Sequence, residues 1–195
     1  MGRWNLEPVV GLAPLNEENA ARHLAEIAAA AAEENVPRVV GLLTGNGPAA
    51  TFLAAVFDLS PFLRDLARRR PQMLDPVFDK PVEARLGEIR AGIATLAGAD
   101  GVSESSLMME LRLRKTEAHF LIALADLAGE ADAAVTVRRL SDLAEACVRA
   151  AVDFLLRDSH RQGKLRLADP ERPAEKSGWI LLGMGKLGAQ ELNFS

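Results

Sequence analysis

The chain has very little of several residue types, and each shortage excludes a class of protein. Of its 195 residues, one is cysteine, none is tyrosine, and aromatic residues make up 5%. The single cysteine, Cys147, excludes a disulfide framework and any cysteine-cluster zinc or iron–sulfur site. With so few aromatic side chains, we do not expect an aromatic stacking surface.

The sequence also lacks the patterns of membrane and secreted proteins. No apolar run approaches the roughly 20 residues of a membrane span. The N-terminus has no basic-then-apolar signal pattern. We therefore expect a cytoplasmic protein with no membrane partner. The net charge of −4 argues against a nucleic-acid partner as well.

What is present is typical of a helical globular protein. Apolar residues make up 49% of the chain and charged residues 26%, an ordinary balance for a folded domain. Alanine is the most frequent residue, and it is the best helix former. The composition therefore predicts a mainly α fold.

Two polar residues are placed as helix caps. Asn16 can cap a helix that runs through Asn35. Ser60 can cap a second helix that opens at Pro61, a favoured first position, and runs to Arg70.

The remaining helices are predicted from the positions of proline and glycine and from the periodicity of apolar residues. Val39–Leu43 is too short for periodicity to decide between helix and strand. Helices of the predicted lengths with short connections favour a bundle, so residues 1–158 are expected to form a helical N-terminal region. Further helices are expected over residues 49–58, 81–98, 105–128 and 136–157.

Two of these helices carry an apolar stripe. In each, apolar residues recur at steps of three and four, which places them on one face. The opposite face of the second helix is polar. The first stripe is Val82, Leu86, Ile89, Ile93 and Leu96; the second is Leu140, Leu143, Ala144, Cys147, Ala151, Phe154 and Leu155; the polar face is Arg139, Asp142, Glu145 and Arg149.

The character of the chain changes after Arg157. Residues 159–178 are polar and without periodicity, and are expected to be a linker or surface loop. Trp179–Leu182 is an apolar run bounded by glycine, which predicts a buried strand. A glycine turn and one helical turn follow. Residues 179–195 therefore read as the start of an α/β domain.

The glycine turn is the strongest functional signal. Gly183, Gly185 and Gly188 form the pattern G-x-G-x-x-G after a predicted strand. Such a turn lets backbone N–H groups face an anion, and Lys186 adds a charge suited to phosphate. The pattern alone also fits a tight turn without a ligand. It is not a Walker A loop, because Leu187 stands where that motif has Ser or Thr.

The whole of residues 183–195 closely resembles the nucleotidyltransferase motif of the glutamine synthetase adenylyltransferases, also called glutamate–ammonia ligase adenylyltransferases. Its Glu191-Leu192-Asn193 resembles the first of that family's two catalytic domains. Segments further upstream resemble the family too. They are residues 60–63, 70–74, 111–115, 125–129 and 140–146.

The resemblance implies a part in a longer, bifunctional enzyme. Its first catalytic domain would remove AMP from a tyrosine of glutamine synthetase, using phosphate and releasing ADP. Its second domain would attach AMP from ATP. The implied partners are glutamine synthetase and a PII-type signal protein. The implied fold is a helical region that leads into a nucleotidyltransferase α/β domain.

The resemblance also implies which residues bind nucleotide or phosphate. Nucleotidyl transfer needs metal ions to neutralise charge on phosphate oxygens. In the family, two aspartates that bind magnesium follow this motif directly, so we expect neither metal ligands nor catalytic residues in this chain, and no activity from it alone. The implied nucleotide- or phosphate-binding residues are Gly183, Gly185, Lys186, Gly188, Asn193 and Ser195.

Two other functions stay open at this stage. The chain could be a stand-alone helical protein-interaction module whose glycine turn is structural. It could also be a fragment of a dinucleotide-binding oxidoreductase, which would need an acidic residue about 20 positions after the glycine turn.

Overall fold

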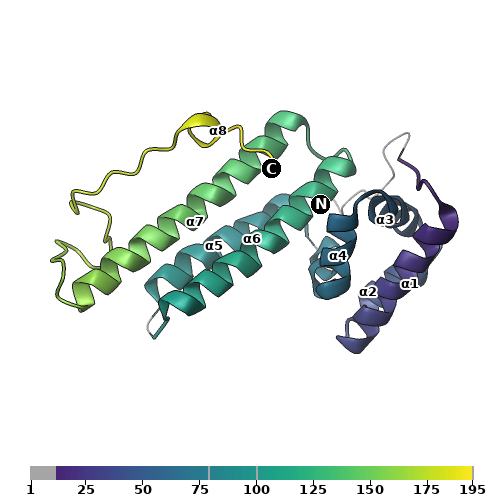
Figure 1. Ribbon diagram of the computed structural model, residues 1–195, viewed down its shortest axis with the longest axis horizontal. Coiled ribbons are helices and arrows are strands. Elements are labelled where there is room, and N and C mark those ends of the chain that lie inside the picture. The colour runs from purple at the N-terminus through teal and green to yellow at the C-terminus, as the bar shows by residue number, and fades with distance from the viewer. Residues whose placement is uncertain (1–11, 79, 100, 195) are drawn as a thin grey trace. The chain divides into compact units, whose positions relative to one another are not determined.

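The structure is a computed structural model that describes residues 12–78, 80–99 and 101–194, and the side chains of Pro76, Val77 and Phe78 are outside that description. These residues form helices and no strand (Figure 1), so the prediction of a mainly α fold is confirmed. The elements are α1 (Glu17–Glu33), α2 (Pro37–Thr44), α3 (Pro48–Leu59), α4 (Pro61–Arg69), the 3-10 helix η1 (Pro71–Phe78), α5 (Val82–Gly98), α6 (Glu104–Leu127), α7 (Ala133–Arg161) and α8 (Gly185–Gly188).

Both predicted caps are present. The side chain of Asn16 accepts from the backbone N–H of Asn19 at 2.9 Å, and the hydroxyl of Ser60 accepts from the N–H of Leu63 at 3.3 Å. Each bond satisfies a helix-terminal N–H that has no partner inside the helix. The helix-or-strand alternative at residues 39–43 is settled as helix α2.

The first helix ends earlier than predicted. It stops at Glu33 rather than Asn35, because Asn35 has a φ of 56° and cannot continue a right-handed helix. Pro37 then opens α2, since a proline fits the first position of a helix.

The chain divides into two compact units. The first comprises Met1–Arg85 with Phe120–Asp132, and the second comprises Leu86–His119 with Ala133–Ser195. In the first unit, α1 packs against α2, α3 and α4. Its largest fully buried side chains include Phe52, Phe57 and Ile27.

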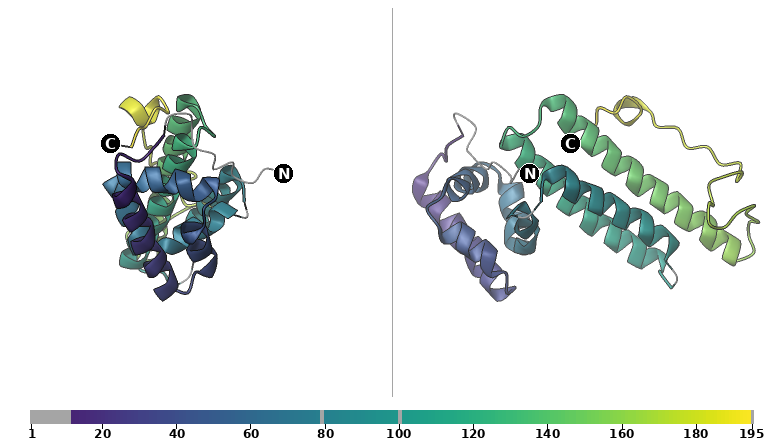
Figure 2. Two further views of the ribbon diagram at one scale, coloured as in Figure 1. Left: turned by 90° about the vertical axis from the view of Figure 1, so that its right-hand side faces the viewer. Right: turned by 180° about the vertical axis from the view of Figure 1, so that it is seen from behind.

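In the second unit, the parts of α5, α6 and α7 that belong to it lie side by side (Figures 1 and 2). Most of the first stripe is buried as predicted, with only Leu96 half-buried. The second stripe is less complete, because Leu155 is exposed. Arg139 was predicted on the solvent face and is buried instead.

Residues 162–194, the returning segment, run back alongside α7 (Figures 1 and 2). The segment has no regular structure before α8. Helix α7 continues through Arg161, so the first three residues of the predicted linker are helical. The prediction of a buried strand at Trp179–Leu182 is wrong for this chain: the four side chains are 61–81% exposed and form no strand. A strand needs a neighbour for its backbone groups, and the described residues supply none.

No single helix among the described residues is long and apolar enough to cross a membrane. Helices α2 and α3 together meet the length and composition test, but they are bent by 87° at their junction. The core helices of folded domains meet the same test, and α3 is largely buried.

Candidate functional site

The glycine turn is held together by a direct contact between Gly183 and Gly188. A Cβ atom on Gly188 would lie 2.5 Å from the carbonyl oxygen of Gly183, far inside the contact distance of real side chains. Only glycine fits at position 188 in this conformation. In the structure Gly185–Gly188 form the short helix α8, and no strand precedes it, so the predicted strand-and-turn unit is not confirmed.

Gly185 sits at the start of α8 with a φ of 56°, a left-handed conformation that glycine adopts without strain. Lys186 follows and its side chain is exposed. That side chain makes no hydrogen bond or ion pair with any other described residue. The turn thus presents one uncompensated positive charge, as a group that binds phosphate should.

The residues after the turn are attached to the helices of the second unit. Gln190 accepts from the guanidinium of Arg138 on α7. The backbone N–H of Leu192 donates to the hydroxyl of Ser141, also on α7, at 3.1 Å.

The last described residue, Phe194, meets the α6 residue His119 edge-on, with 6.2 Å between ring centroids and 88° between ring planes. His119 is half-buried, and burial, with a smaller effect from Lys115, lowers the pKa of its imidazole below the usual value. A neutral ring is suited to this aromatic contact.

A groove of about 540 Å³ lies between α7 and the returning segment. Helix α7 forms one wall with both charged and uncharged residues, and Glu145 and Arg149 pair there at 2.8 Å. The other wall is mostly apolar and includes both close-packed glycines. The lining residues from the returning segment are Ala174, Trp179, Leu181, Gly183, Leu187, Gly188 and Gln190.

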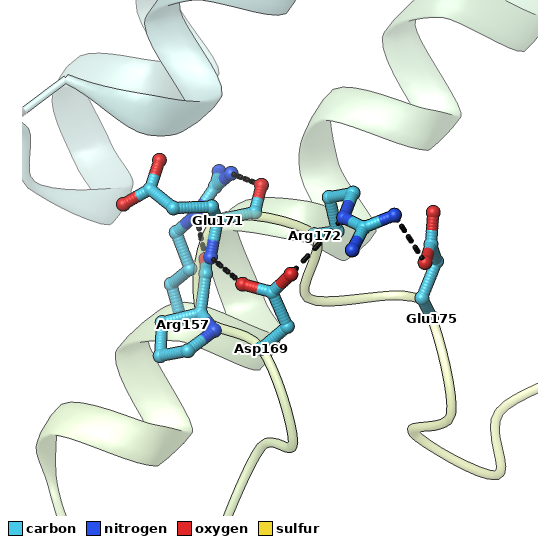
Figure 3. A network of polar contacts seen from close by, with 6 residues as sticks. Arg157, Asp169, Glu171, Arg172 and Glu175 are labelled. Atoms are coloured by element: carbon cyan, nitrogen blue, oxygen red, sulfur yellow. Dashed lines mark hydrogen bonds and ion pairs between the residues drawn. The ribbon is translucent and has the colours of Figure 1, made fainter.

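The start of the returning segment is fixed by Arg157 (Figure 3). Its guanidinium donates to the carbonyl oxygens of Pro170 and Glu171, at 3.0 and 3.1 Å. Next to it, Asp169 accepts from the N–H of Glu171 and from Arg172, both at 3.0 Å. These donors, the Glu171 N–H first, lower the pKa of the Asp169 carboxyl.

The residues predicted to bind nucleotide or phosphate are partly brought together. Gly183, Gly185, Lys186 and Gly188 form one compact turn. Asn193 lies further along the chain, where it is exposed. Ser195 lies outside the described residues.

Sequence reasoning missed the residues that hold this segment. Ser141, Arg138 and His119 belong to helices, and nothing in their spacing distinguishes them from ordinary helical residues. Arg157 lies before the last turn of α7, and a basic residue near the C-terminus of a helix normally indicates only a favourable interaction with the helix dipole. The contacts of Arg138, Ser141 and His119 join residues more than 50 positions apart and leave no local signal.

The described residues do not form a metal site by themselves. No group of three or more His, Cys, Asp or Glu side chains within residues 12–78, 80–99 and 101–194 could hold a metal ion.

Comparisons with known proteins agree with the resemblance. The family model described as "Glutamate-ammonia ligase adenylyltransferase" matches residues 50–195. Three relatives carry the name "Bifunctional glutamine synthetase adenylyltransferase/adenylyl-removing enzyme". The relative from Mesorhizobium japonicum is 67% identical over 98% of this chain and 20% of its own length. The relative from Brucella suis biovar 1 is 48% identical over 94% of this chain and 19% of its own length. The relative from Rhizobium meliloti is 38% identical over 96% of this chain and 19% of its own length.

The chain thus spans about a fifth of the length of these curated relatives. No solved structure matches it. The family model covers most of the chain, including all six residues of the predicted phosphate site. This chain belongs to the glutamate–ammonia ligase adenylyltransferase family.

Proposed function

We propose that this chain is part of a bifunctional enzyme that controls glutamine synthetase. One activity would remove AMP from a tyrosine of the synthetase by phosphorolysis and release ADP; the other would attach AMP from ATP. The names of the relatives support both activities. The resemblance of residues 191–193 to the first catalytic domain favours the adenylyl-removing half.

The observation that carries the proposal is the close-packed glycine turn. A Cβ atom on Gly188 would meet the carbonyl oxygen of Gly183, so the chain can approach itself this closely only with glycine there. A Cβ atom on Gly185 would meet nothing within 4 Å, so the backbone at that residue is open to a ligand. Lys186 stands beside this backbone, exposed and without a polar partner among the described residues. A phosphate group meets both requirements of such a turn, a negative charge and several acceptor oxygens.

In this proposal, residues 179–195 begin the nucleotidyltransferase domain. The exposed apolar side chains of Trp179–Leu182 would be covered by the rest of that domain, as large exposed apolar patches usually are. Asn193 and Ser195 would add phosphate or nucleotide contacts. Residues beyond those described would hold magnesium, so the chain alone would be inactive.

The proposed partners are glutamine synthetase and a PII-type signal protein, and the proposed setting is the cytoplasm. The dinucleotide-binding alternative is not retained, because the matched family is named for adenylyl transfer.

The test uses the full-length enzyme with two variants of the turn, Lys186→Ala and Gly188→Ala. Phosphorolysis of adenylylated glutamine synthetase should fall about 10- to 100-fold, the range expected for one charge-assisted hydrogen bond. Attachment of AMP by the other half of the same molecule is the internal control.

Gly87→Ala is the matched control variant. Gly87 lies in α5 with nothing within 4 Å of an added Cβ, so this change should leave both activities intact. Unchanged phosphorolysis in both turn variants would contradict the proposed role of the turn.

A further inference from the structure

The hydroxyl of Ser141 joins the end of the returning segment, residues 190–194, to α7. Ser141 is 2% exposed. Its Oγ donates to the carbonyl oxygen of Val137 at 2.8 Å and accepts from the N–H of Leu192 at 3.1 Å. The hydroxyl is thereby satisfied as donor and as acceptor, which a buried polar group requires.

Gln190 ends α8 and also contacts α7. Its φ is 59°, and the N–H groups of Gln190 and Glu191 donate to the carbonyl oxygens of Leu187 and Lys186 at 3.1 and 2.8 Å, which is a common way for a helix to end. Arg138, one turn before Ser141 on α7, donates to the Gln190 side chain.

Three residues of this segment are attached to the helices. Gln190, Leu192 and Phe194 each contact α6 or α7, through Arg138, Ser141 and His119 respectively. The intervening residues, Glu191 and Asn193, are exposed. The bond from Leu192 to Ser141 is made by the backbone of Leu192, so it does not depend on the side chain at that position.

We propose that Ser141 is a positioning residue for the phosphate site, with Arg138 and His119 in support. It fixes the position of residues 190–194, and with them Asn193, relative to α7. This inference rests on the proposed function and adds to it a task for the helices: they align the end of the nucleotidyltransferase motif.

The experiment again uses the full-length enzyme. In Ser141→Ala, the Leu192 N–H loses its acceptor, so its amide hydrogen exchange should become faster. The kcat of phosphorolysis should fall about two- to tenfold, as expected for one hydrogen bond. The KM for adenylylated glutamine synthetase and the rate of AMP attachment should not change. Ser141→Thr keeps the hydroxyl and should recover most of the kcat.

Thr95→Ala is the matched control. Thr95 donates to the carbonyl oxygen of Ala91 at 3.0 Å, the same bond to the preceding turn that Ser141 makes, and it has no second polar partner among the described residues. This variant should leave exchange at Leu192 and the kcat unchanged.

Two results would overturn the inference: unchanged exchange at Leu192 in Ser141→Ala, or faster exchange with an unchanged kcat. In either case, a loss of phosphorolysis in Lys186→Ala would leave the proposed function standing. An equal loss of phosphorolysis and AMP attachment in Ser141→Ala would indicate general destabilisation and would also overturn the inference.

Discussion

The guanidinium of Arg157 donates to the carbonyl oxygen of Ala97 over 2.7 Å, and so joins α7 to the last turn of α5. Carbonyl groups in the last turn of a helix have no partner inside that helix. The same guanidinium donates to Pro170 and Glu171. One side chain therefore closes a helix end and fixes the start of the returning segment.

Replacing this side chain should cost stability. We expect Arg157→Met to lower the free energy of unfolding by about 2–3 kcal/mol, because three carbonyl groups lose a charged donor. Arg157→Lys should recover only part of this, since an ammonium group lacks the planar fork of a guanidinium. Urea unfolding of the 195-residue chain measures both changes.

Arg149→Met is the control for charge removal on the same helix. Arg149 pairs with Glu145 in an exposed i, i+4 arrangement, so its loss should cost no more than about 0.5 kcal/mol. Equal losses in Arg149→Met and Arg157→Met would contradict the role given to Arg157.

A second prediction concerns His23 in the first unit. Arg64 donates to Nε2 of His23 at 2.9 Å, so the ring is neutral and carries its proton on Nδ1. Burial, followed by the charge of Arg64, lowers the pKa of His23 below the usual 6.5. Between the two pKa values the unfolded chain binds more protons than the folded one. Stability should therefore fall as the pH drops below 6.5.

The measurement is the free energy of unfolding in urea at several pH values from 8 to 5. In His23→Gln the fall below pH 6.5 should be smaller than in the parent chain. Some fall should remain, because the pKa of His119 is also lowered. An identical pH dependence of stability in the variant would show that His23 does not contribute to the fall.

A third prediction concerns the one cysteine. Cys147 is half-buried, and burial raises the pKa of its thiol above the usual value. Because the thiolate is the reactive form, the folded chain should react slowly with a thiol reagent at pH 8. The urea-unfolded chain should react at the rate of a free cysteine. Equal rates in the two states would show that the thiol is accessible.

A fourth prediction concerns Trp179–Leu182. These residues are exposed and form no strand, so in this chain their amides should exchange within seconds. The amides in the middle of α7 provide the slow-exchanging reference. Strong protection across residues 179–182 in a monomer would contradict the structure. Protection that appears only at high concentration would indicate pairing between chains, a hazard of an unpaired apolar segment.

Local signals predicted most of the helices. Asn16 and Ser60 act as caps because a cap involves only residues three apart in the chain. The stripe from Val82 to Ile93 is buried because its periodicity matches that of a helix. The close approach of Gly183 and Gly188 is local too, since it joins residues only five positions apart.

The failures have one physical origin. Trp179–Leu182 has the composition of a buried strand, but composition cannot supply the neighbour that a strand needs. The burial of Arg139 and the role of Ser141 depend on what packs against α7, and a helical pattern does not contain that information. The attachment of the candidate site to the helices was therefore not predictable.

The returning segment is much longer than the distance it covers. From Arg161 back to Ser141, the axis of α7 measures about 30 Å. Residues 162–192 could reach about 100 Å if fully extended. The segment is thus far from fully extended, so its length does not determine the position of the glycine turn. Insertions or deletions of a few residues between Glu175 and Trp179 should therefore be tolerated. Inserting or deleting a single residue between Gly188 and Leu192 should not be tolerated.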